Sequence, residues 1–213
     1  MAYALPNGST FEIASALSAS KTVTEISNAT EAEVTSTAHG LVAGDYIVLL
    51  SGWSKLNNRV FKIAAGTADT FTLVGTDTTS IALYPEDQGA GTFKKVTAWV
   101  PISQITEVAF AGGEQQFLNF AFLEDAEEKQ MPTTKSATSM TLTVADDPNL
   151  PYVTVVETAD LDLQPRPLRL NLVTGAVFAY NAIVSITSTP TVNRDELMTR
   201  AISLSLQARP TRI

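Results

Sequence analysis

The feature that most constrains the fold is a series of short segments rich in β-branched and aromatic residues, separated by Gly, Asn, Asp or Pro. Residues 10–15, 139–144 and 201–206 alternate apolar with polar side chains. This period of two is typical of antiparallel strands with one buried and one solvated face. Because the segments recur about every ten residues, they favour a sandwich or barrel, and the sequence predicts an all-β fold.

The same patterns locate the individual strands. Strands are predicted over residues 9–17, 32–37, 46–51, 60–64, 70–74, 93–100, 104–110, 115–123, 139–144, 167–172, 176–187 and 200–208. One short helix is predicted over residues 151–159, with Asn149 as its cap and Pro151 in its first turn. Residues 84–91 and 124–136 are predicted to be long loops, and residues 111–114 a hairpin turn.

The composition excludes several classes of protein. The chain has 213 residues, of which 45% are hydrophobic, and this suffices for a sizeable core. It contains no cysteine, which excludes disulfides, thiolate metal sites and thiol nucleophiles. No signal peptide and no apolar run long enough to span a membrane are recognisable. We therefore expect a soluble protein that stays in the cell that makes it until that cell breaks.

The charge is acidic and unevenly distributed. The formal net charge is -8, which is unfavourable for gripping nucleic-acid phosphates. Residues 102–163 hold eleven acids against Lys129 and Lys135, whereas residues 164–213 hold six arginines against Asp195 and Glu196. This asymmetry fits either complementary contacts between copies of the chain or two separate solvated faces.

Catalytic signatures are missing from the sequence. The chain has one histidine, His39, in a predicted turn. Hydrolase or zinc chemistry requires further catalytic or metal-binding residues beside the histidine. The acid pairs Asp146–Asp147 and Asp160–Asp162 are better explained as surface residues than as a glycosidase pair. We therefore predict no enzyme activity, no catalytic or metal-binding residues and no cofactor.

Aromatic residues are predicted to fill the core and not to form a ligand platform. They are Trp53, Trp99, Phe61, Phe71, Phe117, Phe120 and Phe122. The segment 117–123 is apolar on both strand faces, so both faces need cover. A second sheet or a helix provides this cover in a monomer, and a neighbouring subunit provides it in a ring.

Residues 21–95 have the pattern of a self-contained unit. Turn signals occur at residues 39–41 (HGL), 44–45 (GD) and 56–58 (LNN), and a small core is predicted from Val60, Phe61, Ile63, Phe71 and Leu73. This spacing resembles a small β module called the FCCH-like domain after ubiquitin-activating enzymes, which is often met in phage virion proteins. The resemblance implies a fold and no ubiquitin chemistry.

The segments that flank this module join sensibly once it is removed. Residues 1–20 and 96–213 then contain an N-terminal strand, two strands around the loop 124–136, the short helix and three closing strands. This order resembles the tail tube proteins of long-tailed bacteriophages. The resemblance implies a discontinuous β-sandwich or barrel domain, with the module of residues 21–95 inserted into it on the exterior of the tube.

The family resemblance also implies the function. It implies a structural virion subunit whose hexameric rings stack into a tube, through which DNA passes without specific binding. It implies contacts with tape measure, tail tip and terminator proteins, no membrane, assembly in the host cytoplasm and a place in the virion tail. The loop between rings would present Glu124, Asp125, Glu127, Glu128, Lys129 and Met131.

Two other classes remain open at this stage. One is a different virion structural protein, such as a capsid decoration or tail terminator protein, which forms trimers or single rings. The other is a carbohydrate-binding β-sandwich, for which an exposed aromatic platform is expected.

Overall fold

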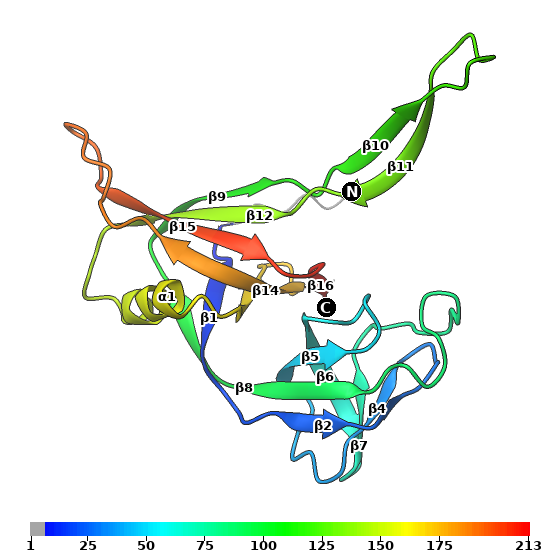
Figure 1. Cartoon of the computed structure of the whole chain (residues 1–213). Helices are drawn as coiled ribbons and strands as arrows, with labels where there is room; N and C mark the ends of the chain where they lie inside the picture. The colour runs from blue at the N-terminus through cyan, green and yellow to red at the C-terminus, as the bar shows by residue number, and fades with distance from the viewer. Residues whose placement is uncertain (1–6) are drawn as a thin grey trace.

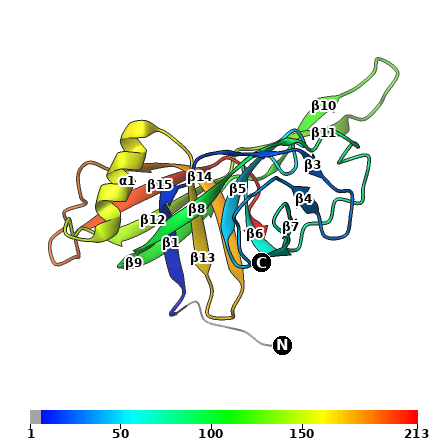
Figure 2. The ribbon, with the colours of Figure 1, turned by 90° about the horizontal axis from the view of Figure 1, so that it is seen from below.

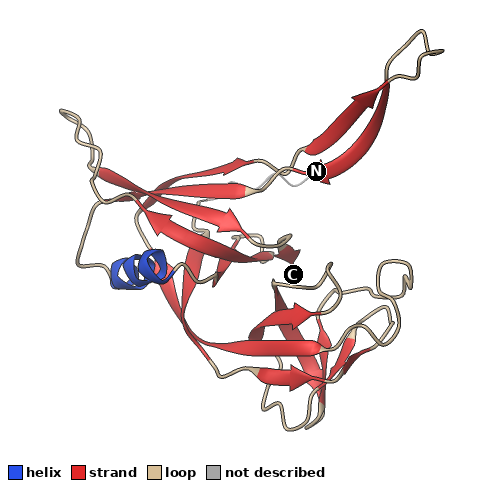
Figure 3. Cartoon of the chain, in the orientation of Figure 1, coloured by secondary structure: helices blue, strands red, loops and turns tan. Residues whose placement is uncertain are grey.

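The fold is described from a computed structural model that covers residues 7–213 (Figure 1). The predicted all-β class is confirmed, because one large antiparallel sheet dominates the chain and only one helix occurs in the described residues (Figure 3). The main strand path runs β3-β4-β7-β6-β5-β8-β1-β13-β14-β15-β12-β9. A separate two-stranded hairpin, β10–β11, projects from one end.

The strands of the large sheet are divided between two lobes. The helix lobe contains β1 (Thr10–Leu17), β9 (Ile105–Ala111), β12 (Ser139–Ala145), α1 (Pro151–Asp162), β13 (Arg166–Asn171), β14 (Val177–Ile186), β15 (Thr199–Leu206) and β16 (Thr211–Arg212). The all-strand lobe contains β2 (Lys21–Val23), β3 (Glu25–Ile26), β4 (Glu33–Thr35), β5 (Tyr46–Ser51), β6 (Arg59–Gly66) and β7 (Thr70–Leu73). Figure 2 shows the all-strand lobe at the opposite end from α1.

The long strand β8 (Gly91–Ile102) belongs to both lobes. Its first half pairs with β5 and β2, and its second half pairs with β1. The chain therefore crosses from one lobe to the other inside a continuous strand, without a linker.

The core of the helix lobe follows from the alternation in the sequence. Met140 lies opposite Leu204, and Leu142 lies opposite Ile202, in the pairing of β12 with β15. All four side chains are buried. Helix α1 covers this core with Tyr152, Val153, Val156 and Ala159. Removal of this apolar surface from water is the main stabilising contribution here.

The cap predicted for α1 is wrong. The N-cap is Leu150, and it makes no side-chain capping bond. Asn149 instead hydrogen-bonds through its backbone and side-chain amides to the carboxylate of Asp147. The helix also runs three residues further than predicted, to Asp162, where Leu163 adopts a left-handed conformation with φ 53° and ends it.

The all-strand lobe has a core of its own. Phe61, Phe71, Leu73 and Phe93 are all buried within one cluster. Trp53 is buried in the same cluster, and its indole Nε1 donates a 2.7 Å hydrogen bond to the Pro85 carbonyl. The core role predicted for Trp53, Phe61 and Phe71 is confirmed.

The two lobes are joined by a third, smaller cluster. Ala14, Val60, Val96 and Ala179 are buried there, and strands from both lobes contribute. The Arg169 guanidinium lies 4.5 Å from the Trp99 ring centroid and 5.2 Å from that of Tyr46, and it forms an ion pair with Glu12. Cation–π contacts of this kind favour one fixed orientation of the lobes.

Substitution of Arg169 by Met is expected to cost roughly 1–3 kcal/mol at pH 7, because Glu12 would keep its partly buried charge without its partner. Burial raises the pKa of Glu12, but the hydrogen bonds from Arg169 and Asn171 and the positive charge of Arg169 together lower it below 4.5. The stabilisation is therefore present above about pH 4.5 and is lost as the pH falls through the lower folded-state pKa.

Thermal unfolding followed by circular dichroism at pH 7 and pH 3 checks this expectation. The difference in unfolding midpoint between wild type and Arg169→Met should be smaller at pH 3 than at pH 7. The double variant Glu12→Gln with Arg169→Met should lack this pH dependence. A gap of the same size at both pH values would contradict it.

Candidate assembly surface

The hairpin of β10 (Gln115–Phe120) and β11 (Lys129–Lys135) projects away from both lobes (Figure 1). Within residues 7–213 its strands pair only with each other, with Leu118 opposite Met131. We call residues 114–136 the arm. Because a two-stranded hairpin is marginally stable alone in water, an arm of this kind is suited to a surface that a partner covers.

Two glycines and one serine form the root of the arm. Gly112 and Gly113 have positive φ angles of 81° and 82°, and a Cβ on Gly112 would lie 1.9 Å from the carbonyl oxygen of Ala137. Ser136 accepts a hydrogen bond from the Glu114 amide through its Oγ and donates its own amide to the Glu114 carbonyl. The predicted hairpin turn at 111–114 is wrong, because the chain passes from β9 into β10 without reversing.

The arm contains every predicted contact residue. Glu124, Asp125, Glu127 and Glu128 lie in the loop at its tip, whereas Lys129 and Met131 belong to β11. The predicted loop 124–136 is therefore too long, because residues 129–135 form a strand. Pro132 argued against a strand at these residues in the sequence. Proline is nevertheless compatible with an edge strand such as β11.

Asp125 organises the tip. Its carboxylate accepts a 2.7 Å hydrogen bond from Lys129 Nζ and a 3.0 Å hydrogen bond from the Phe122 amide, and these bonds lower the pKa of Asp125. Lys129 Nζ also lies 5.5 Å from the centroid of the Phe122 ring. Glu124, Glu127 and Glu128 are exposed and form no ion pair in the described part of the chain. The tip is thus an ordered turn that presents unpaired negative charge.

Apolar side chains cover both faces of the arm. Phe117, Leu118, Phe122, Leu123 and Met131 are each more than half exposed. The core role predicted for Phe117 and Phe122 is wrong in the single subunit, because neither lobe reaches them, and Phe120 is only half-buried. Clustered exposed apolar residues of this kind mark an interaction surface.

The exposed surface continues onto β9. This strand ends the main strand path, with β12 on one side and no described strand on the other. Val108 and Phe110 are exposed on it. An open edge with apolar side chains offers unpaired backbone groups to another chain.

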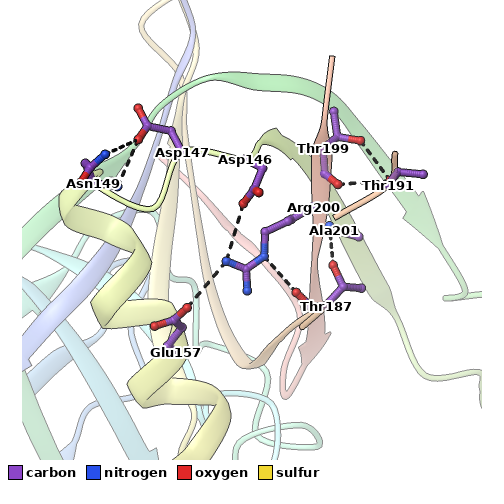
Figure 4. A network of polar contacts seen from close by, with 9 residues as sticks. All are labelled: Asp146, Asp147, Asn149, Glu157, Thr187, Thr191, Thr199, Arg200 and Ala201. Carbon is purple, nitrogen blue, oxygen red and sulfur yellow. Dashed lines mark hydrogen bonds and ion pairs between the residues drawn. The ribbon is translucent and has the colours of Figure 1, made fainter. Parts of the chain in front are cut away.

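A second projection is the loop of residues 187–198, which leads into the N-terminal end of β15. In Figure 4, Arg200 reaches from β15 toward the turn before α1 and toward the helix itself. Its Nε donates a 2.9 Å hydrogen bond to the Thr187 carbonyl, and its Nη1 lies 3.6 Å from Glu157 and 3.9 Å from Asp146. These contacts fix the base of loop 187–198, which carries the exposed side chains of Val192, Leu197 and Met198.

The lone histidine has a structural role. His39 is buried, its Nδ1 accepts the Leu41 amide at 2.9 Å, and its Nε2 lies 2.9 Å from the Thr67 carbonyl. These contacts hold the predicted turn. Within residues 7–213, no three His, Asp or Glu side chains are grouped closely enough to hold a metal ion. No helix of the described chain is both long and apolar enough to cross a membrane.

The tryptophans do not form an open platform for a sugar. Trp53 is buried, and Trp99 is half-buried beneath Arg169. The exposed aromatic residues are phenylalanines on β9 and the arm. The sequence placed the acidic residues Glu124, Asp125, Glu127 and Glu128 together in one loop, but the exposed apolar surface of β11 and β9 was missed because exposure depends on tertiary placement.

A comparison with protein families identifies the family of the chain. A family model described as phage tail tube protein, TTP, matches residues 51–213. The sequence has no significant match among curated proteins.

Solved structures give distant matches only. The anti-feeding prophage tube terminating cap matches with 17% identity, 49% of this chain, 78% of that chain and a TM-score of 0.36. The sheath/tube terminator of an extracellular contractile injection system, PVC, matches with 15% identity, 53% of this chain, 86% of that chain and a TM-score of 0.37.

Proposed function

Because the chain belongs to the phage tail tube protein family and is thus a structural subunit of a virion tail, we propose that its copies close into hexameric rings, which stack into the tube that delivers phage DNA. The observation that carries this proposal is the exposed apolar arm, which projects from the end of an open-edged sheet. An exposed apolar surface of this kind is unfavourable in water and is typical of a contact with another protein.

Lateral contacts would close the ring. Identical subunits that meet head to tail form a closed ring when the rotation between them divides a full turn. The open edge of β9, with Val108 and Phe110 exposed, supports pairing with the sheet of the next subunit. Such pairing would remove the exposed edges and build a continuous inner barrel.

Axial contacts would use the arm. It extends beyond both lobes, and its apolar residues on β10 and β11 need cover that the subunit itself does not provide. We assign it to the contact with an adjacent ring. Glu124, Asp125, Glu127, Glu128, Lys129 and Met131 are the residues proposed for that contact.

The net charge of -8 suits a conduit for DNA. A negative inner wall repels phosphates, so that the genome passes without adhering. We therefore propose no specific DNA binding. The other partners that we propose are the tape measure, tail tip and terminator proteins. We propose that the tube assembles in the host cytoplasm.

Native mass spectrometry tests the ring. Oligomers with six copies, or with whole multiples of six, are expected from the purified chain at high concentration. Stable trimers or five-membered rings would contradict the proposed symmetry.

We propose that the all-strand lobe is the FCCH-like module predicted for residues 21–95 and that it decorates the exterior of the tube. Excision of residues 21–95 is expected to spare tube formation, because the core of the helix lobe contains no residue of that segment. The truncated chain should lose a few kcal/mol of stability, since Ala14, Val96 and Ala179 at the junction become exposed.

Electron microscopy of the excised chain checks the expectation. Thinner tubes with the wild-type inner diameter would support an external module. A folded excised chain that forms no tubes would show that the module takes part in assembly.

A further inference from the structure

The arm carries unpaired negative charge at its tip. The tip holds Glu124, Glu127 and Glu128, all exposed and unpaired in the described part of the chain. The root holds Lys135 at the end of β11, and Lys135 forms no ion pair with any described residue. At the root, Glu114 is exposed as well, so the arm is negative at its tip and carries no net charge at its root.

Positive charge gathers in a groove beside the root. It has a volume of about 320 Å³ and is lined by Lys135, Ser136 and Thr138 on one side and by Gln207 and Arg209 on the other. No acidic residue lines it. Lys135, Gln207 and Arg209 are exposed. We call this site the root groove.

A further cation reinforces the field of the root groove. Arg59 lies close to the groove, because its Nη2 reaches the side chain of Thr211, the residue after Pro210 in the groove lining, at 3.2 Å. Arg59 donates to the hydroxyl of Thr211 and to the Lys55 carbonyl, and it pairs with no carboxylate of residues 7–213. Positive charge therefore accumulates near the groove without a counterion from the same subunit.

We propose that the root groove of one subunit receives the acidic arm tip of a second copy of the chain. The proposal rests on the proposed tube function and identifies the receiving surface of the axial contact. Charge complementarity carries it: three unpaired carboxylates at the tip match a groove with two unpaired cations and no acid. Desolvated charge pairs of this kind select one partner and one register.

The length of the arm determines which copy is the partner. Strand β10 alone spans five residue steps, roughly 17 Å at about 3.3 Å per residue, so the tip lies far from the root groove of its own subunit. The partner is therefore another copy of the chain, and the axial role proposed for the arm puts that copy in an adjacent ring. Because each copy has one tip and one groove, the contact repeats from ring to ring without limit.

Crosslinking tests the contact directly. The chain lacks cysteine, so the double variant Glu127→Cys with Gln207→Cys places one thiol at the tip and one at the groove of each copy. After assembly, a short bis-maleimide is expected to produce a ladder of dimers, trimers and longer products on a denaturing gel. The matched control Glu127→Cys with Thr30→Cys, whose second thiol lies on the all-strand lobe, should give at least about tenfold less ladder.

The outcomes separate the inference from the function on which it rests. Normal tubes without a ladder, or with an equal ladder in the control, would overturn the root groove and leave the tube function intact. A wild-type chain that stays monomeric at every concentration would overturn both.

Charge reversal provides a second test on the full chain. Glu127→Lys with Glu128→Lys, and separately Lys135→Glu with Arg209→Glu, should each shorten tubes at least about tenfold. The four substitutions combined should restore much of the tube length. The control Lys55→Glu with Lys94→Glu makes the same charge change as Lys135→Glu with Arg209→Glu, but outside the groove. It should leave the tube length unchanged. Failure of the combined variant to recover, with each double variant folded, would overturn the proposal.

Discussion

Deletion of residues 114–137 is expected to leave a folded subunit that forms no long tubes. Ala111 and Ser139 are paired neighbours on β9 and β12, so Gly112, Gly113 and Thr138 can close a three-residue hairpin between them. The deleted arm pairs only with itself, and most of its side chains are exposed. The thermal unfolding midpoint should therefore change by only a few degrees.

Electron microscopy and sedimentation velocity measure the effect. The deletion should abolish particles longer than a single ring, while isolated rings remain permitted because β9 is retained. Normal long tubes from a subunit without its arm would contradict the role assigned to the arm.

Substitution of Phe71 by Ala is expected to destabilise the all-strand lobe by about 3–5 kcal/mol. Phe71 is completely buried, and its ring contacts the Phe93 ring at 5.4 Å and the His39 ring at 5.0 Å between centroids. Because the helix lobe has a separate core, the loss should remain largely within the all-strand lobe. Hydrogen exchange in β4, β6 and β7 should accelerate, whereas β12 and β15 should retain their protection.

The matched control is Leu204→Ala, which removes a completely buried side chain from the core of the helix lobe. It should cost about 2–5 kcal/mol and accelerate exchange in β12 and β15 first. Equal acceleration throughout the chain in both variants would contradict the proposal that residues 21–95 form a unit of their own.

The strands with clean alternation could be predicted from the sequence. The predicted segment 139–144 matches β12 almost to the residue, because Met140, Leu142 and Val144 all face one core. The short strands β2, β3 and β16 were not predicted, because two or three residues are too few to show a period. Their pairing depends on the neighbouring strands.

The arm shows why the candidate site could be predicted only in part. An acidic segment after an apolar strand indicated a functional loop, and its acidic residues do lie at the tip. The sequence Lys-Gln-Met-Pro-Thr-Thr-Lys of β11 has no alternation, because neither of its faces meets a core. For the same reason, Phe117 and Phe122 resembled core residues until the tertiary structure placed them in solvent.

The root groove could not be predicted from sequence. It brings Lys135 and Arg209 together, although 74 positions separate them in the sequence. The reversal of charge between residues 102–163 and 164–213 suggested contacts between copies but gave no location for them.

Negative-stain electron microscopy of the purified, concentrated chain tests the central claim most directly. The account predicts hollow tubes of stacked rings with a central channel and six-fold symmetry in end-on views. Discrete trimers, or closed single rings that never stack at any concentration, would contradict it.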